Sequence, residues 1–375
     1  MNMKTKTFKT SMALCAALIA VAAFSGRGYT QQNQNAANGE IQMLPVSGNI
    51  YMLVGDGGNI TMSIGRDGIL LVDTGTAANA DKLLATVKRI ATQLVSAPVP
   101  VTPCVGLRCG EYSSPFGWNS PNINGVISSP PPPQPIRYVI NTSIDPDHTG
   151  GNKKVVAAGV TYTGGNVASS GGAPQGAALI AHENILLRLS EQVPGKPAVP
   201  GNELPSDTYH LSFYKLSHFF NGEGVQVIHM PDAHTDGDSI VYFRYSDVIS
   251  AGDILNETSY PVIDVDKGGS IQGIIDGLTR ILDIGIPEFR TQGGTMVIPG
   301  HGRLCDMADV VYYRDMLSIV RDRIQDAINR GLTVQQIKTA KLTMDFDKRW
   351  GSTTGPWTTD MFIDAVYKSL TKKGR

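Results

Sequence analysis

The sequence predicts an α+β protein in which short strands form two groups, each accompanied by helices. From Ile41 onward, short apolar runs alternate with turns rich in glycine and aspartate, a pattern typical of β-strands. Other stretches place apolar residues three and four positions apart, which is typical of helices that bury one face. Because no linker separates the two groups, we expect a single domain over residues 41–330.

The first group opens with three strands, at residues 50–54, 59–64 and 68–73. A helix is expected next, because five apolar residues share one face at helical spacing: Leu83, Leu84, Val87, Ile90 and Leu94. Two further strands are expected at 137–140 and 178–181, and a helix follows the second of them directly. This group therefore mixes strands with helices.

The second group has strands at 225–229, 239–243 and 248–250, and another that begins at Thr295. A long helix then follows, because one apolar stripe runs up to Gly331 and consists of Val310, Tyr313, Leu317, Val320, Ile324 and Ala327.

Residues 331–375 are expected to form a helical extension packed on the same domain. Thr333 and Gln336 have the spacing of a capping box, which marks the start of a helix. The last helix is indicated by apolar residues on one face, namely Phe362, Val366 and Leu370.

The N-terminal residues are typical of a secretory signal peptide. An uncharged apolar run from Ser11 to Phe24 follows three positive charges, at Lys4, Lys6 and Lys9, and a small-x-small triplet ends at Ser25. We expect a signal peptide over 1–25 and a loose polar leader over 26–40. The protein is then periplasmic or secreted in a bacterium, with no stable membrane insertion after signal removal. An uncleaved membrane anchor is the alternative.

Residues 97–135 lack any periodicity and are rich in proline, so we expect a surface insertion there. The insertion contains Cys104 and Cys109. In an oxidising compartment these two residues could pair as a disulfide, and two free thiols are the alternative.

Composition excludes several classes of protein. Apolar residues make up 41% of the 375 residues and charged residues 17%, which excludes global disorder. Lysine and arginine number 32 against 33 acidic residues, so the net charge is −1. This balance gives no electrostatic footprint for nucleic acid or an anionic membrane.

Four short segments carry histidines and aspartates at or after apolar strands. They are 141–152, which contains Asp145, Asp147 and His148, then 231–238 with His234, 251–253 with Asp253, and 297–302 with His301. Strand ends are rigid platforms whose loops converge on one cleft. Imidazoles and carboxylates that converge there form a ligand set for a transition metal. Three crowded carboxylates also call for a cation.

The order and spacing of these segments resemble the metallo-β-lactamase superfamily of hydrolases. The resemblance covers about residues 41–330 and includes the upstream segment 71–75. It implies an αββα sandwich, in which two mixed sheets are flanked by helices and the site lies at one edge between the sheets. It also implies that Asp73 supports the site from behind the metal ligands.

The sequence departs from the main motif of that family, His-x-His-x-Asp-His. Ser143 and Asp145 stand where the family has its two leading histidines, whereas Asp147 and His148 match. Because a neutral hydroxyl is a poor ligand for zinc, the departure weakens one of two metal sites.

The resemblance assigns the ligands to two sites. The second site is complete and consists of Asp147, His148, Asp253 and His301. The first site keeps His234, the bridging Asp253 and the carboxylate of Asp145. We therefore expect one tightly bound divalent ion, Zn²⁺ above all, with a second ion weak or absent. The weakened first site would prefer Mn²⁺ or Fe²⁺.

The function predicted from these residues is metal-dependent hydrolysis of a small-molecule ester, thioester, lactone, amide or lactam. Asp147 and Asp145 are the candidate catalytic residues, since either carboxylate could orient the attacking water or carry its proton. The alternative is a catalytically silent protein that keeps the fold and binds a metal or ligand in the degenerate cleft.

Overall fold

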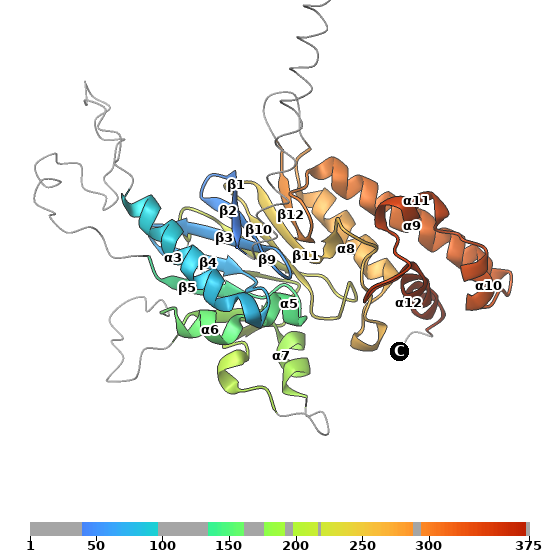
Figure 1. Cartoon of the computed structure of the whole chain (residues 1–375), viewed down its shortest axis with the longest axis horizontal. Helices are drawn as coiled ribbons and strands as arrows, with labels where there is room; N and C mark the ends of the chain where they lie inside the picture. The colour runs from blue at the N-terminus through green and yellow to red at the C-terminus, as the bar shows by residue number, and fades with distance from the viewer. Residues whose placement is uncertain are drawn as a thin grey trace, which may run out of the picture. The chain divides into compact units, whose positions relative to one another are not determined.

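The computed structural model describes residues 40–96, 134–160, 176–191, 198–216, 219–287 and 294–372 (Figure 1). The predicted signal peptide, nearly all of the leader, most of the insertion and both of its cysteines lie outside these residues. Of the two compact units in the chain, the larger one runs from Met43 to Arg375 and contains every residue of the predicted site.

The first sheet has seven strands in sequence order, from β1 to β7. The pairs β2–β3 and β3–β4 are antiparallel, whereas β4, β5, β6 and β7 run parallel to one another, so the sheet is mixed. Its strands are β1 (Gln42–Ser47), β2 (Ile50–Val54), β3 (Ile60–Gly65), β4 (Gly68–Val72), β5 (Ile136–Ile140), β6 (Ala178–His182) and β7 (Asp207–Tyr209).

The second sheet has five strands in the order β12-β11-β10-β9-β8. Only the β11–β12 pair in it is parallel, so this sheet is mixed as well. Its strands are β8 (Phe213–Lys215), β9 (Val225–His229), β10 (Ser239–Phe243), β11 (Val248–Asn256) and β12 (Met296–His301). Two mixed sheets with helices beside them confirm the predicted fold class.

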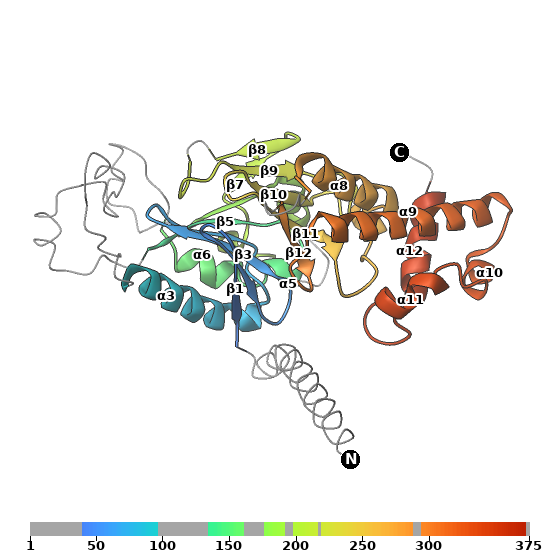
Figure 2. The ribbon, with the colours of Figure 1, turned by 90° about the horizontal axis from the view of Figure 1, so that it is seen from above.

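Helices flank both sheets (Figure 2). On the side of the first sheet lie α3 (Ala80–Ser96), α5 (Pro146–Thr149), α6 (Asn152–Ala157) and α7 (Glu183–Ser190). The second sheet packs against α8 (Ile271–Ile284), which in turn packs against α9 (Met307–Asn329). The C-terminal helices are α10 (Val334–Thr339), α11 (Met344–Trp350) and α12 (Thr359–Thr371), and three short 3-10 helices are η1 (Ala77–Asn79), η2 (Gly201–Glu203) and η3 (Val265–Lys267).

Among the described residues, two clusters of the apolar core lie one on each side of the second sheet. The part between the sheets takes Ile50 and Leu70 from the first sheet and Val227 and Phe243 from the second. The other part lies between the second sheet and the helices α8, α9 and α12. Because Ile337, Trp350 and Phe362 are fully enclosed there, the C-terminal helices share the core of the domain.

The structure differs from the sequence analysis in two elements near the site. Strand β11 continues to Asn256 and is not limited to residues 248–250. Helix α8 was not predicted, because its apolar residues are nearly continuous and two glycines, Gly273 and Gly277, interrupt the helical pattern. The capping box of Thr333 and Gln336 is present at the start of α10, as predicted.

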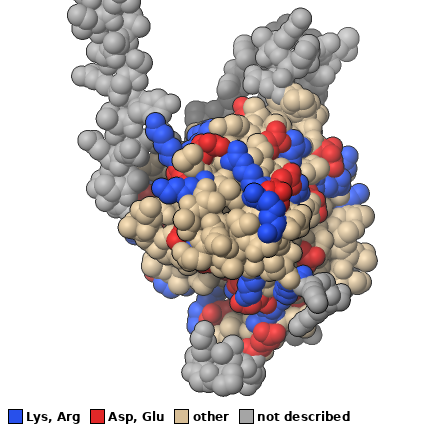
Figure 3. Space-filling view, turned by 90° about the vertical axis from the view of Figure 1, so that its right-hand side faces the viewer, with Lys and Arg blue, Asp and Glu red and all other residues tan. Residues whose placement is uncertain are grey.

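The face formed by the C-terminal helices carries basic and acidic side chains in an intermixed arrangement (Figure 3). Ion pairs such as Lys338–Asp364 and Arg323–Asp345 join them at distances of 2.7 and 2.8 Å. Among the residues that the structure describes, no helix combines the length and the apolar character needed to cross a membrane.

Candidate metal centre

Three of the predicted ligands come from one short stretch of chain after β5. Asp145 directly precedes α5, whose first residue is Pro146, and Asp147 and His148 lie within its single turn. Proline fixes the backbone angle that a first helical residue needs, so the helix starts at a defined position. The turn therefore holds Asp145, Asp147 and His148 at the end of the first sheet.

The second sheet supplies the other three ligands. His234 lies in the loop that follows β9, and His301 is the last residue of β12. Asp253 was expected after its strand but lies within β11. The pairing of β11 with β12 shifts register on both sides of Gly252, whose φ is +54°. A side chain at Gly252 would meet the Thr142 hydroxyl, 2.5 Å from an added Cβ, so this position requires glycine.

Asp147, His148 and His301 come together in one group of ligand atoms that all lie within 4.8 Å of one another. The Oδ2 atom of Asp147 is 3.1 Å from Nε2 of His301. The rings of His148 and His301 are nearly perpendicular, with centroids 5.6 Å apart. These residues are three of the four that were predicted for the second site.

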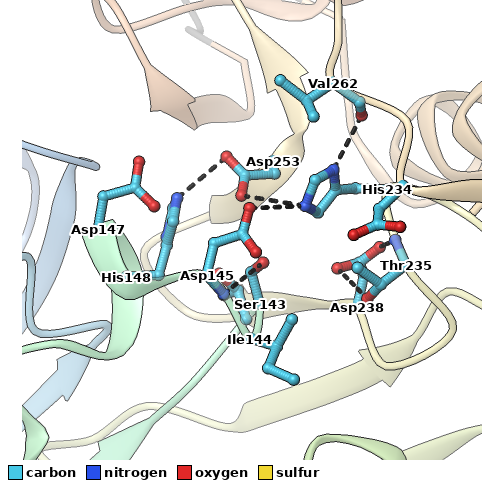
Figure 4. A network of polar contacts seen from close by, with 12 residues as sticks. Ser143, Ile144, Asp145, Asp147, His148, His234, Thr235, Asp238, Asp253 and Val262 are labelled. Carbon is cyan, nitrogen blue, oxygen red and sulfur yellow. Dashed lines mark hydrogen bonds and ion pairs between the residues drawn. The ribbon is translucent and has the colours of Figure 1, made fainter. Parts of the chain in front are cut away.

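Asp145, His234 and Asp253 form the other group within the described residues. Oδ2 of Asp145 is 3.0 Å from Nε2 of His234 (Figure 4). Asp253 lies between the two groups. Its Oδ1 is 3.0 Å from Nε2 of His148 and 3.6 Å from Nε2 of His301. Its Oδ2 is 4.0 Å from Nε2 of His234. This placement is the one expected of a bridging ligand.

The hydroxyl of Ser143 contacts the backbone of the ligand segment. The side chain is buried, and its Oγ accepts a hydrogen bond of 3.4 Å from the backbone N–H of Asp145 (Figure 4). The first site thus keeps one histidine and two carboxylates. The neutral hydroxyl of Ser143 would be a poor ligand for zinc there.

Asp73 lies behind His148, as the resemblance implied. The carboxylate is buried and accepts hydrogen bonds from the backbone N–H and the hydroxyl of Thr142, at 2.8 and 2.6 Å. The Nδ1 atom of His148 is 2.8 Å from the same carboxylate. Asp73 has a φ of +67°, a left-handed conformation that aspartate tolerates better than most residues. Its carboxylate therefore fixes both the orientation and the tautomer of His148.

His234 is oriented by a backbone group. Its Nδ1 is 2.8 Å from the carbonyl oxygen of Val262 (Figure 4). A carbonyl oxygen only accepts hydrogen bonds, so Nδ1 carries the hydrogen and Nε2 presents its lone pair to the site. The backbone N–H of Asp264 also donates to the carbonyl of His234, at 2.9 Å.

The electrostatics of the centre call for a cation. The Nε2 atoms of His148 and His234 face carboxylate oxygens, although in each ring it is Nδ1 that carries the hydrogen. Burial opposes protonation of His148, yet Asp253 and Asp73 raise its pKa well above the ordinary value. Burial is likewise outweighed at His234, where a hydrogen bond to Asp145 and the charges of Asp238, Asp253 and Asp145 raise the pKa to about 10.

The residues present fit a divalent ion. Without a cation, each of the two rings must carry a second proton, on Nε2, in order to face a carboxylate. A metal ion removes that requirement because it binds both the Nε2 atom and the carboxylate oxygen. Nitrogen and carboxylate oxygen are the ligands that Zn²⁺ and its neighbours prefer. Asp73 behind His148 and the carbonyl behind His234 provide the outer support that metal-binding histidines usually have.

Part of the chain matches a known family in sequence. A sequence model of the metallo-beta-lactamase superfamily matches residues 131–301, which include every candidate metal ligand. This segment belongs to the metallo-beta-lactamase superfamily. The predicted resemblance is therefore confirmed for this segment. No match was found among curated proteins.

Several solved structures have the metallo-beta-lactamase fold seen here. The stereoselective inverting sec-alkylsulfatase Pisa1 from Pseudomonas sp. aligns with 88% of this chain and 50% of its own, at 15% identity and a TM-score of 0.50. This chain thus spans about half the length of that sulfatase. A metallo-beta-lactamase from Pontibacter korlensis aligns with 74% of this chain and 99% of its own, at 13% identity and a TM-score of 0.48.

Sequence reasoning missed several residues that shape the candidate metal centre. The carbonyl of Val262 carries no side-chain signal, so only the fold reveals it. Gly58 lies against the ring of His148, where an added Cβ would be 2.7 Å from Cε1. Lys267, in η3, places its Nζ 4.0 Å from Oδ1 of Asp145. Of these, only the Gly-Gly turn of Gly57 and Gly58 could have signalled a close approach of backbone to the site.

Proposed function

We propose that the protein is a metal-dependent hydrolase that binds one divalent ion tightly, at the second site. The observation that carries the proposal is that, in the second site, Nε2 of His148 lies 3.0 Å from Asp253 and Nε2 of His301 lies 3.1 Å from Asp147. The second site supplies two imidazoles, from His148 and His301, and two carboxylates, from Asp147 and Asp253. The first site has a single imidazole, so its affinity for an ion should be lower.

A divalent ion held by these residues would lower the pKa of a water molecule and stabilise negative charge on a substrate oxygen. The side chains of the chain itself handle the proton. A hydrogen bond from His301 lowers the pKa of Asp147, against the effect of burial, so this carboxylate is ionised at neutral pH. Asp147 and Asp145 remain partly exposed, at 36% and 28%, and can therefore reach an entering water and substrate. We assign them the roles of orienting the water and accepting its proton.

Zn²⁺ is the ion proposed for the second site, because imidazole and carboxylate together suit it. The first site, with two carboxylates and one imidazole, has the harder donor set and would favour Mn²⁺ or Fe²⁺ if it is filled. The proposed substrates are small molecules with an ester, thioester, lactone, amide or lactam bond. The fold alone does not choose among them, because one fold hosts many reactions.

A substrate panel tests this proposal. We expect purified protein to hydrolyse at least one of a generic ester, a thioester, a lactone, a chromogenic cephalosporin and a secondary alkyl sulfate, the last chosen because the sulfatase shares the fold. A chelator should abolish that activity, and added Zn²⁺ should restore it.

The alternative, a catalytically silent protein, makes the opposite prediction for the same panel. Protein that binds the ion tightly but turns over none of these substrates would favour a binding role. Activity that persists in chelator would contradict metal-dependent hydrolysis.

We further propose that the chain is exported, on the evidence of the basic and apolar N-terminal residues. N-terminal sequencing of protein recovered from the periplasm or medium should then begin after Ser25. Exported protein that still begins at Met1 would contradict cleavage.

A further inference from the structure

We propose that the ammonium group of Lys267 is the permanent cation of the first site, where it takes the place of a second divalent ion. The inference rests on the proposed function, because it concerns the charge balance of the same centre. It assigns a role to a residue outside the ligand segments and explains how the first site can work without its two leading histidines.

The backbone holds Lys267 beside His234. Lys267 is the last residue of η3 (Val265–Lys267), and its N–H donates to Oδ1 of Asp264 at 2.9 Å. Asp264 itself donates to the carbonyl of His234, and the carbonyl of Lys267 accepts from the N–H of Asp236 at 3.0 Å. The 3-10 turn is therefore tied to the His234 loop on both sides.

The side chain of Lys267 reaches toward the first site. Its Nζ is 2.6 Å from Oδ2 of Asp264 and 4.0 Å from Oδ1 of Asp145. The other oxygen of Asp145 is the one that lies 3.0 Å from Nε2 of His234. A single carboxylate thus connects the lysine to the metal-binding histidine, and Asp264 keeps the ammonium within reach of it.

The charges around Lys267 favour its charged form. The carboxylates of Asp264 and Asp145 lie 2.6 and 4.0 Å from its Nζ and stabilise the positive charge that a lysine carries at neutral pH. The neighbouring cation, Arg188, is bound to Asp236 through two hydrogen bonds of 2.8 and 2.6 Å, so that pair is neutral. Lys267 also pairs with Asp264, but among the described lysines and arginines it is the one whose charged group approaches Asp145.

Two consequences follow for the first site. An ion placed between Asp145, His234 and Asp253 would be repelled by an ammonium group next to the same carboxylate. With its side chain 40% exposed, Lys267 also faces the solvent, where it can stabilise negative charge on a substrate oxygen. The first site then contributes positive charge through a side chain and the second site through an ion.

The test compares the affinity of the second ion in three full-length proteins. Metal-free wild type, Lys267→Met and Lys267→Arg are each titrated with Zn²⁺ and with Mn²⁺ by equilibrium dialysis against a chelator of known affinity. We expect Lys267→Met to bind the second ion about tenfold more tightly or better, because one like charge is removed from a partly exposed site. Lys267→Arg keeps the charge and should retain weak binding of the second ion.

Lys368→Met is the matched control. The Nζ of Lys368 is 2.6 Å from Asp266, which lies in the same 3-10 turn, so this variant removes an equivalent charge without touching Asp145. Its affinity for either ion and its turnover should equal those of wild type.

The outcomes separate this inference from the proposed function. If wild type binds one ion tightly and Lys267→Met binds the second ion no more tightly than wild type does, the role of Lys267 is overturned. The proposed function then still stands. Two tightly bound ions in wild type also overturn it. A wild type that binds no ion overturns the proposed function itself.

Discussion

His301→Ala is expected to lose the bound ion and the hydrolytic activity together. His301 provides one of the two imidazoles of the second site, and no other histidine of that group can replace it. Supporting residues behind metal ligands typically cost 10–100-fold in affinity when they are changed, so removal of a direct ligand should cost about 100-fold or more. Metal analysis after dialysis and turnover of the substrate identified in the panel measure the two losses.

His210→Ala is the control for this variant. His210 is exposed and belongs to neither ligand group, so its replacement should leave metal content and turnover unchanged. If His301→Ala retained the rate of wild type, metal catalysis at this centre would be wrong. Circular dichroism of both variants distinguishes loss of a ligand from loss of the fold.

Asp73→Asn is expected to have the next largest effect, although Asp73 is not itself a ligand. The substitution keeps the size of the side chain, and asparagine tolerates the φ of +67° at this position. However, one acceptor oxygen becomes an amide donor. This donor then faces either the N–H of Thr142, or the hydroxyl of Thr142 together with Nδ1 of His148. We expect metal affinity to fall by about 10–100-fold with the fold retained, as measured by competition with a chromophoric chelator.

Asp247→Asn offers a closely matched control. Asp247 also has a positive φ, of 55°, and its carboxylate accepts hydrogen bonds from the hydroxyls of Tyr242 and Thr295. It makes no contact with the candidate ligands, so any change in its variant should appear in thermal stability and not in metal affinity. An Asp73→Asn protein with the metal affinity of wild type would show that Asp73 does not position His148.

The candidate ligands could be predicted because their signals are local. Asp147 and His148 stand in a motif with fixed spacing, and His234 and His301 each follow an apolar strand. The motif also predicted that the hydroxyl of Ser143 is a poor ligand for zinc, and this stays a prediction. Short-range spacing thus identified the side chains, and the fold brought them together as expected.

Other features of the site depend on long-range geometry that spacing does not encode. The carbonyl of Val262 orients His234 from 28 residues away, and a backbone group has no residue type to reveal it. Lys267 approaches Asp145 across 122 positions of sequence, since η3 packs on the His234 loop. The position of Asp253 inside β11 arises from an irregular pairing at Gly252, which apolar patterning does not predict.

The contribution of the C-terminal helices was also only partly foreseeable. Their apolar stripes predicted helices, but not that they would hold the loop leading to Val262. Tyr260 in that loop stacks on Phe362 with centroids 4.4 Å apart, and its hydroxyl donates to Asp347 at 2.9 Å. The backbone N–H of Tyr260 donates to the carbonyl of Trp350. These helices lie beyond the family match at 131–301, so the match itself gave no sign of their role.

The most direct test of the account is a titration of metal-free protein with Zn²⁺ in which bound metal and turnover are followed together. A single complete site predicts that turnover rises in proportion to bound ion and reaches its maximum at about one equivalent per chain. Turnover that appears only with the second equivalent would contradict hydrolysis by one ion at Asp147, His148, His301 and Asp253. Full turnover in the metal-free protein would contradict it as well.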